Sequence, residues 1–183
     1  MDRYILTGAP GAGKTTTARL LAAAGHTVVA EAATDLIEAA QADGQDAPWE
    51  QAAFCEAIAA LQRDRQIAAD ALPGPVQYFD RSPVCTLALA RFTNQPVGPA
   101  LAAELDRIRT ERVYRPRVLM LDLLGFVVPT AVRRVDLAQA QRFEDVHVQA
   151  YTEHGFTVER IPAAPPRARA ALLHQLTCRE SHA

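Results

Sequence analysis

The sequence predicts an α/β protein in which helices cover both faces of a parallel β-sheet. Three observations indicate this fold class. Short apolar runs alternate with longer segments whose apolar residues recur at helical spacing, glycine or proline marks many of the boundaries, and several apolar runs end in an acidic residue. Such alternation is typical of a parallel sheet whose strands are joined by helical crossovers.

Glycine divides the first elements. Tyr4–Thr7 is a short apolar run that ends at glycine, and we expect a buried strand there. Gly13–Ala24 is expected to be a helix that Gly25 closes in the usual C-terminal position. A second apolar run, Thr27–Ala30, predicts the next strand, and a helix is expected at residues 32–42.

The middle of the chain is divided by proline. Residues 49–72 are expected to form one long helix, because apolar residues recur at i, i+4 and i+7 from Phe54. A Pro-Gly-Pro sequence at 73–75 ends it, and Val76–Phe79 is expected to be the third strand. A helix at Pro83–Arg91 follows.

The last third repeats the alternation. Helices are expected at Pro99–Arg112, Leu137–His154 and Arg167–Leu176, where apolar residues fall on one helical face or a glycine follows the last turn. The apolar runs Arg117–Leu121 and Thr157–Ile161 predict the fourth and fifth strands. The predicted chain therefore holds five strands, each followed by at least one helix.

Composition limits the function. With 183 residues, of which 49% are hydrophobic and 22% charged, the chain is long enough to bury a core, and we expect one domain over residues 1–183. A net charge of −2 gives no electrostatic basis for binding nucleic acid or an anionic membrane. No leader or membrane-spanning pattern is visible, so we expect a cytoplasmic protein that is a monomer or homodimer.

The segment from Gly8 to Thr15 has the pattern G-x-x-x-x-G-K-T between an expected strand and an expected helix. Backbone N–H groups of such a loop converge on phosphate oxygens, and the helix start adds positive potential. Lys14, the only lysine among 19 basic residues, would reach the β- and γ-phosphates, and the Thr15 hydroxyl would ligate Mg²⁺. The nucleotide-binding residues expected in this loop are Gly8, Ala9, Pro10, Gly11, Ala12, Gly13, Lys14 and Thr15.

Two aspartates compete for the magnesium-side role. Asp80 and Asp122 each follow an apolar run, at the carboxyl end of an expected strand, where parallel sheets bind their ligands. Asp80 is followed by Arg81, which places a carboxylate beside a guanidinium that can bind phosphate through two hydrogen bonds. We favour Asp80 as the magnesium-side acid, while Asp122 is a supporting polar group or a turn residue.

Three other charged residues are candidates for catalysis. Glu31 follows the second strand and is placed to accept the proton of an attacking hydroxyl, although a helix N-terminus also favours acidic residues. Arg133 and Arg134 lie in the connector before the long helix. They would close over the triphosphate, or they are ordinary surface arginines. Trp49 would stack on an aromatic substrate or, more simply, pack in the core.

The chain resembles a small single-domain AAA P-loop family that is similar to the nicotinamide-riboside kinase domain and to nucleoside and nucleotide kinases. The residues that carry the resemblance are YILTGAPGAGKTTTARLLAAAGHTVVAEAA, PW at 48–49, FDRS at 79–82 and the RR…FED segment with HGF and IP near the end. The resemblance implies a three-layer α/β/α P-loop NTPase fold with strand order 2-3-1-4-5. It also implies that Thr16 faces the α-phosphate and that Ile161 and Pro162 border the adenine.

The same resemblance implies an ATP-dependent, magnesium-dependent phosphotransferase. Asp80 and Arg81 would lie at the reaction centre, a lid around residues 123–137 would carry the two connector arginines, and a helical region around residues 32–72 would bind the small-molecule phosphoryl acceptor. The acceptor would be a nucleoside, a nucleotide or a related metabolite. The alternative is a stand-alone ATPase or nucleotide switch that acts on a protein partner. ATP is favoured over GTP because no N-K-x-D pattern is present.

Overall fold

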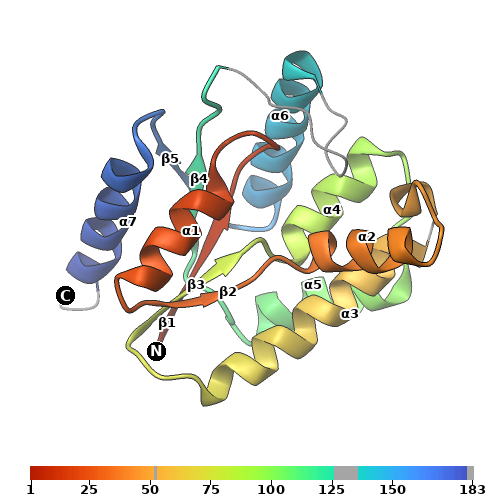
Figure 1. Ribbon diagram of the computed structural model, residues 1–183. Coiled ribbons are helices and arrows are strands. Elements are labelled where there is room, and N and C mark those ends of the chain that lie inside the picture. The colour runs from red at the N-terminus through yellow and green to blue at the C-terminus, as the bar shows by residue number, and fades with distance from the viewer. Residues whose placement is uncertain (52, 126–135, 181–183) are drawn as a thin grey trace.

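The computed structural model describes residues 1–51, 53–125 and 136–180. Within these ranges five strands form one fully parallel sheet in the order β2-β3-β1-β4-β5 (Figure 1). The strands are β1 (Asp2–Thr7), β2 (Thr27–Val29), β3 (Val76–Asp80), β4 (Arg117–Leu121) and β5 (Thr157–Ile161). The predicted fold class and strand order are confirmed.

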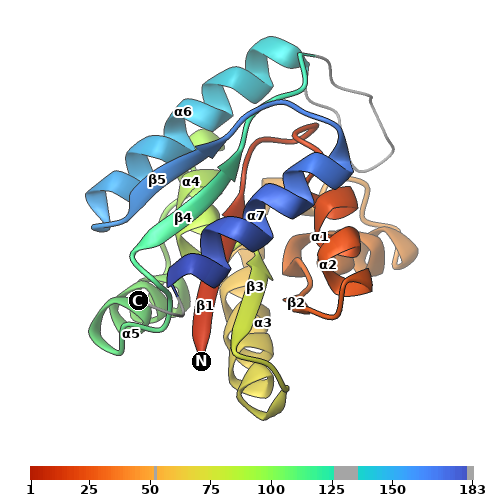
Figure 2. The same cartoon turned by 90° about the vertical axis from the view of Figure 1, so that its left-hand side faces the viewer.

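Helices cover both faces of the sheet, as the turned view in Figure 2 shows. One face carries α1 (Lys14–Ala23) and α7 (Pro166–Glu180), which pack against each other. The other face carries α3 (Ala53–Ala68), α4 (Pro83–Phe92), α5 (Pro99–Thr110) and α6 (Leu137–Glu153). The short helix α2 (Ala32–Ala42) follows β2 and packs against α3.

The three central strands β1, β3 and β4 are mostly buried, because helices cover both faces of the sheet there. On β1, Tyr4 and Leu6 belong to the cluster under α1 and α7, whereas Ile5 between them belongs to the cluster under the helices of the other face. All three side chains are fully buried. This alternation gives the molecule two separate hydrophobic cores that share only the sheet.

A third, smaller cluster lies between α2 and α3, away from the sheet. Its buried members are Ala32, Phe54 and Ile58, and Trp49 packs against them. The region expected to bind the acceptor therefore has an apolar interior of its own, formed by helix packing after β2.

The helix expected at residues 49–72 is three separate pieces. A 3₁₀ helix η1 (Pro48–Glu50) precedes α3, and another, η2 (Ala69–Ala71), follows it. Gln51, directly after η1, has an extended backbone (φ −85°, ψ 135°), so the chain leaves helical geometry before α3 begins. Periodicity from Phe54 onward located α3 correctly but could not show this interruption.

The last helix is longer than expected, because it continues past Leu176 to Glu180. Thr177 explains part of this extension. Its side chain is fully buried, and its hydroxyl lies 2.6 Å from that of Tyr78 on β3. None of the helices in the described ranges combines the length and the apolarity that a bilayer span requires.

Candidate functional site: a phosphate-binding loop beside a charged strand end

The loop between β1 and α1 lies at the carboxyl end of the central strand. Gly8 has φ of +138°, and a Cβ atom there would lie 2.6 Å from the carbonyl oxygen of Leu121 at the end of β4. Only glycine fits this close approach between two backbones. Gly13 precedes α1 with φ of +79°, so the loop enters the helix through a left-handed residue.

Lys14 folds over this loop. Its Nζ atom donates to the carbonyl oxygens of Gly8, at 2.8 Å, and Ala9, at 3.4 Å. Burial, with the charge of Arg81 adding to it, lowers the pKa of Lys14 to about 8. Thr15 and Thr16, the next two residues, are exposed. The loop thus presents a lysine and two hydroxyl groups around its backbone N–H groups.

Asp80 is the last residue of β3 and is nearly buried. Its Oδ1 atom has no hydrogen-bond partner among the described residues. Burial raises the pKa of Asp80 and the charge of Glu31 adds to this, while Lys14 and Arg81 oppose the shift without cancelling it. Asp80 is therefore a desolvated carboxylate, beside two cations, with an oxygen that the protein leaves unpartnered.

Asp122 has a different environment. Its carboxylate forms an ion pair with Arg160 of β5, with 2.6 Å between Oδ1 and Nε. Its backbone N–H donates to the carbonyl oxygen of Ile161 at 2.9 Å, which ties the end of β4 to the end of β5. These contacts favour the supporting role that we considered for Asp122.

The residues present fit a magnesium ion carried by a nucleotide. The described residues contain no group of three or more His, Cys, Asp or Glu side chains that could hold a metal ion by themselves. The exposed residue Thr15 and the unpartnered carboxylate oxygen of Asp80 offer Mg²⁺ two protein oxygens. Nucleotide phosphates and water would supply its other ligands, which is how proteins usually bind Mg²⁺.

Glu31 and Arg81 form an ion pair at the ends of β2 and β3. Arg81 Nε lies 2.5 Å from Glu31 Oε1, and Thr34 donates its hydroxyl to Oε2 at 3.3 Å. Burial alone would raise the pKa of Glu31, but the charges of Arg81 and Lys14 and these hydrogen bonds hold the pKa below its usual value. Glu31 directly precedes α2 and makes no side-chain cap hydrogen bond to it.

Arg81 adopts an uncommon backbone conformation, with φ of +78°. For a residue with a Cβ atom this left-handed geometry costs about 1 kcal/mol. The surrounding contacts hold it there, since its N–H donates to Leu6 at 3.0 Å and its guanidinium binds Glu31. Strain at a charged strand end is a common property of functional sites.

His147 of α6 contacts the other side of the same guanidinium. Its Nδ1 lies 2.7 Å from the carbonyl oxygen of Phe143, which can only accept, so Nδ1 carries the proton. Nε2 is then an acceptor and faces Arg81 Nη1 at 3.4 Å. Sequence reasoning missed this residue. The available signal was its spacing, because His147 lies one turn after Phe143 on the buried face of the helix.

His147 is expected to make the protein sensitive to acid. Burial and the charge of Arg81 lower the pKa of His147 from 6.5 to about 3. The unfolded chain therefore binds a proton below pH 6.5 that the folded protein excludes, and stability falls as the pH drops through this window. Between about pH 7.5 and about pH 5, this single group accounts for a loss of about 2 kcal/mol.

Urea denaturation of the wild type and of His147→Gln at both pH values measures this loss. Glutamine is neutral throughout, so the pH-dependent drop in the free energy of unfolding should be smaller by about 2 kcal/mol in the variant. Equal drops in the two proteins would mean that His147 titrates normally in the folded state.

Arg169 of α7 is a second residue that sequence reasoning missed. It is a fully buried arginine whose hydrogen bonds all go to backbone carbonyl oxygens: Nη1 to Ala12 at 2.5 Å, Nη2 to Asp122 at 2.6 Å, and Nε to Pro162 at 2.9 Å. A longer bond from Nη2 reaches Ile161 at 3.4 Å. One guanidinium thus joins the phosphate-binding loop to the ends of β4 and β5.

A cavity of about 740 Å³ brings eight of the candidate site residues together. From the loop it is lined by Pro10, Gly11, Gly13, Lys14, Thr15 and Thr16, and from the strand ends by Glu31 and Arg81. Gly8, Ala9, Ala12 and Asp80 are buried and are not among the lining residues, and Ile161 and Pro162 contact Arg169. Arg133 and Arg134 lie outside the described residues, as does most of the expected lid.

The cavity continues from the loop toward α2 and α3. Its far part is lined by residues of α2, η1, α3, α4 and α6, among them Trp49, Phe54 and Phe143. Trp49 is half-buried, lines the cavity and packs on the third cluster, so the structure shows its packing role, and stacking on a substrate stays a prediction. The region around residues 32–72 therefore faces the same space as the phosphate-binding loop.

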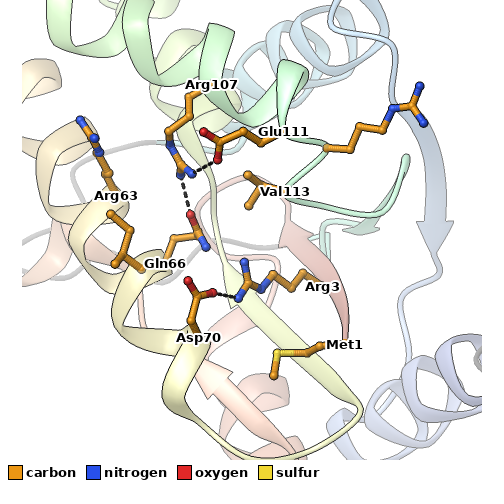
Figure 3. A pocket seen from close by; sticks show the side chains of 10 residues that line it. Met1, Arg3, Arg63, Gln66, Asp70, Arg107, Glu111 and Val113 are labelled. Atoms are coloured by element: carbon orange, nitrogen blue, oxygen red, sulfur yellow. Dashed lines mark hydrogen bonds and ion pairs between the residues drawn. The ribbon is translucent and has the colours of Figure 1, made fainter.

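A second pocket, of about 510 Å³, lies near the start of β1 and is rich in arginine (Figure 3). Two of its arginines are engaged by neighbours. Arg3 forms an ion pair with Asp70, and Arg107 binds Glu111 and the side-chain oxygen of Gln66. This pocket lies at the amino end of the central strand, away from the phosphate-binding loop.

Comparison with known proteins agrees with this geometry. A family model described as "AAA domain" matches residues 3–169. The fold is similar to that of deoxyadenosine kinase from M. mycoides with bound dATP, at 13% identity and a TM-score of 0.53, over 96% of this chain and 98% of that one. It is also similar to that of thymidylate kinase from Candida albicans, at 12% identity and a TM-score of 0.54, over 100% of this chain and 93% of that one. No curated protein is significantly similar in sequence.

Proposed function

Because the chain belongs to the AAA domain family and its P-loop lies in a fold shared with nucleoside and nucleotide kinases, we propose that it is a small-molecule kinase. It would transfer the γ-phosphoryl group of ATP to a hydroxyl of a nucleoside, a nucleotide or a related metabolite. Similarity to the two solved structures supports the fold only. The proposed reaction is therefore argued from the residues of the site.

One observation carries the proposal. The phosphate-binding loop and the Glu31–Arg81 pair line the same cavity, which also extends into an apolar region large enough for a small molecule. An ATPase or a switch also uses polar and arginine side chains at its phosphates, so the feature that favours a kinase is the apolar pocket that adjoins the Glu31–Arg81 pair. A kinase needs both groups at that point, one for the hydroxyl proton and one for the charge on the transferred phosphoryl group.

In this proposal each residue has a chemical role. Glu31 accepts the proton of the acceptor hydroxyl, whose oxygen forms a bond to the γ-phosphorus as the bond to the β-phosphate oxygen breaks and ADP leaves. Arg81 and Lys14 stabilise the negative charge on the phosphate oxygens. Thr15 and Asp80 would hold Mg²⁺, which when bound neutralises charge on the β- and γ-phosphates. His147 positions Arg81 and does not touch substrate.

A phosphotransfer screen tests the proposal directly. The protein is incubated with γ-labelled ATP, Mg²⁺ and a panel of nucleosides, nucleotides, vitamins and other small alcohols, and labelled products are separated. Transfer of label to at least one acceptor is expected. ATP hydrolysis that a protein partner stimulates, without label in any acceptor, would instead favour the switch alternative.

Lys14→Ala tests the donor half of the site. Removing a charge-assisted hydrogen bond to phosphate is expected to weaken ATP binding about tenfold or more. Titration calorimetry measures this change, and Arg19→Ala is the matched control, since Arg19 lies on the same helix but is exposed. Unchanged ATP affinity in Lys14→Ala would show that the loop does not bind the triphosphate.

A further inference from the structure

The far part of the cavity, called here the acceptor pocket, has an aromatic and aliphatic wall. The apolar residues that line it come from α2, η1, α3, α4 and α6, among others, and include Trp49, Phe54, Ile58, Leu89, Phe92 and Phe143. The rings of Phe92 and Phe143 pack with their centroids 4.7 Å apart. Walls of this kind bind flat rings, which stack on or pack edge-on against aromatic side chains.

Cations are scarce in this lining. Among the described residues that line the whole cavity, Lys14 and Arg81 are the only basic ones. Lys14 belongs to the phosphate-binding loop, and Arg81 is paired with Glu31 where the loop and the acceptor pocket meet. Glu50, an exposed residue of η1, adds a negative charge on the acceptor side.

Two arginines outside the lining, on α3 and α4, are engaged elsewhere. Arg65 of α3 forms an ion pair with Asp35 and donates to the carbonyl oxygen of Glu31 at 2.5 Å. Arg91 of α4 pairs with Glu153, with 2.7 Å between the charged atoms. In the described lining, the acceptor pocket offers a phosphate group no basic side chain beyond Arg81, which Glu31 already pairs, so a phosphate bound there would lose its hydration and meet the acidic side chain of Glu50.

Apart from Glu50, the described polar groups of the acceptor pocket beyond the Glu31–Arg81 pair are neutral. Thr34, Gln62, Thr86 and Thr93 line the cavity, and Thr86 donates its hydroxyl to Gln62 Oε1 at 3.0 Å. Neutral amide and hydroxyl groups suit the hydroxyl and ring heteroatoms of an uncharged molecule.

We propose that the acceptor is an uncharged alcohol that carries a flat ring, and that the pocket discriminates against the phosphorylated form of the same compound. This inference rests on the proposed kinase function and narrows it, because it selects nucleoside-like alcohols over nucleotides. The Glu31–Arg81 pair marks where the acceptor hydroxyl lies, and the aromatic wall marks where its ring lies.

Trp49 provides the measurement. It is the only tryptophan in the chain and lines the acceptor pocket, so its fluorescence reports ligands bound there without requiring turnover. The protein, with Mg²⁺ and a non-hydrolysable ATP analogue present, is titrated with pairs that consist of a nucleoside, or another ring-bearing alcohol, and its monophosphate. The uncharged member of a binding pair is expected to bind at least about tenfold more tightly. The same pairs are then compared as acceptors by kcat/KM.

Two variants of Gln62 add a matched test. Gln62→Lys introduces a cation into the acceptor pocket, and Gln62→Met alters the same position without adding charge. Gln62→Lys is expected to raise monophosphate affinity relative to the uncharged partner, and Gln62→Met is not. The wild-type comparison decides the question even if a variant does not fold.

The outcomes separate this inference from the proposed function. Transfer that occurs preferentially to monophosphates would overturn the inference and leave the kinase function standing. No transfer to any compound would overturn the kinase function, and the fluorescence titration would still decide which member of each pair binds. Tighter binding of the monophosphates, or no response to any uncharged member, would overturn the inference.

Discussion

Arg81→Ala is expected to lower kcat about a thousandfold while changing ATP affinity several-fold at most. Arg81 lines the cavity between the loop and the acceptor pocket, where negative charge develops as the phosphoryl group moves. Its guanidinium is held by Glu31 on one side and by His147 on the other, so it requires little reorganisation during the reaction. Steady-state kinetics and calorimetry measure the two effects separately.

Two further variants make this result interpretable. Arg81→Lys keeps a charge beside the buried Glu31 but cannot contact Glu31 and His147 together, so its kcat is expected to remain far below that of the wild type. Arg91→Ala removes an exposed arginine of α4 and should leave kcat nearly unchanged. Equal losses of ATP affinity and kcat in Arg81→Ala would show that Arg81 contributes to ATP binding and not specifically to phosphoryl transfer.

Arg169→Met is expected to lower the free energy of unfolding by about 3 kcal/mol. The substitution keeps an unbranched apolar stem on α7 but leaves the carbonyl oxygens of Ala12, Asp122 and Pro162 without their donor. The hydrogen bond to Ala12 is buried and the other two are partly buried, so their loss together is costly. Urea denaturation of the nucleotide-free protein at neutral pH measures the change.

Arg167→Met is the control for this prediction. Arg167 lies on the same helix two residues earlier and is exposed, so its replacement should change the free energy of unfolding by less than about 0.5 kcal/mol. If both variants were as stable as the wild type, the backbone carbonyls would not depend on Arg169. Weaker ATP binding is also expected in Arg169→Met, because Ala12 belongs to the phosphate-binding loop.

Much of the fold could be predicted from local patterns. β4 begins and ends where its apolar run does, because a strand buried on both faces leaves a short continuous apolar signal. The helix at residues 49–72 was predicted too long, since the extended backbone at Gln51 leaves no trace in apolar spacing. The end of α7 depended on a contact between Thr177 and Tyr78, which are far apart in the sequence.

The parts of the candidate site that consist of short sequence motifs could be predicted from the sequence. The phosphate-binding loop and the Asp80–Arg81 dipeptide have local signatures, and parallel strands bring their ends together. His147 contacts Arg81, and Arg169 donates to backbone carbonyl oxygens such as that of Ala12. These partners are far away in the sequence, so no local pattern could predict them. Arg169 did leave one trace. It lies four residues before the buried Leu173, on the face of α7 where an apolar residue would be expected.

The division of the interior into separate cores bears on how this protein can evolve. α1, which follows the phosphate-binding loop, and α7, which carries Arg169, pack on one face of the sheet, whereas the aromatic wall belongs to helices of the opposite face and to the small cluster around Phe54. Mutations that reshape the wall change few side chains packed against the loop. In the proposed kinase, new acceptor preferences would therefore accumulate by substitution in the wall, while the phosphate-binding loop and the residues that support it are inherited unchanged.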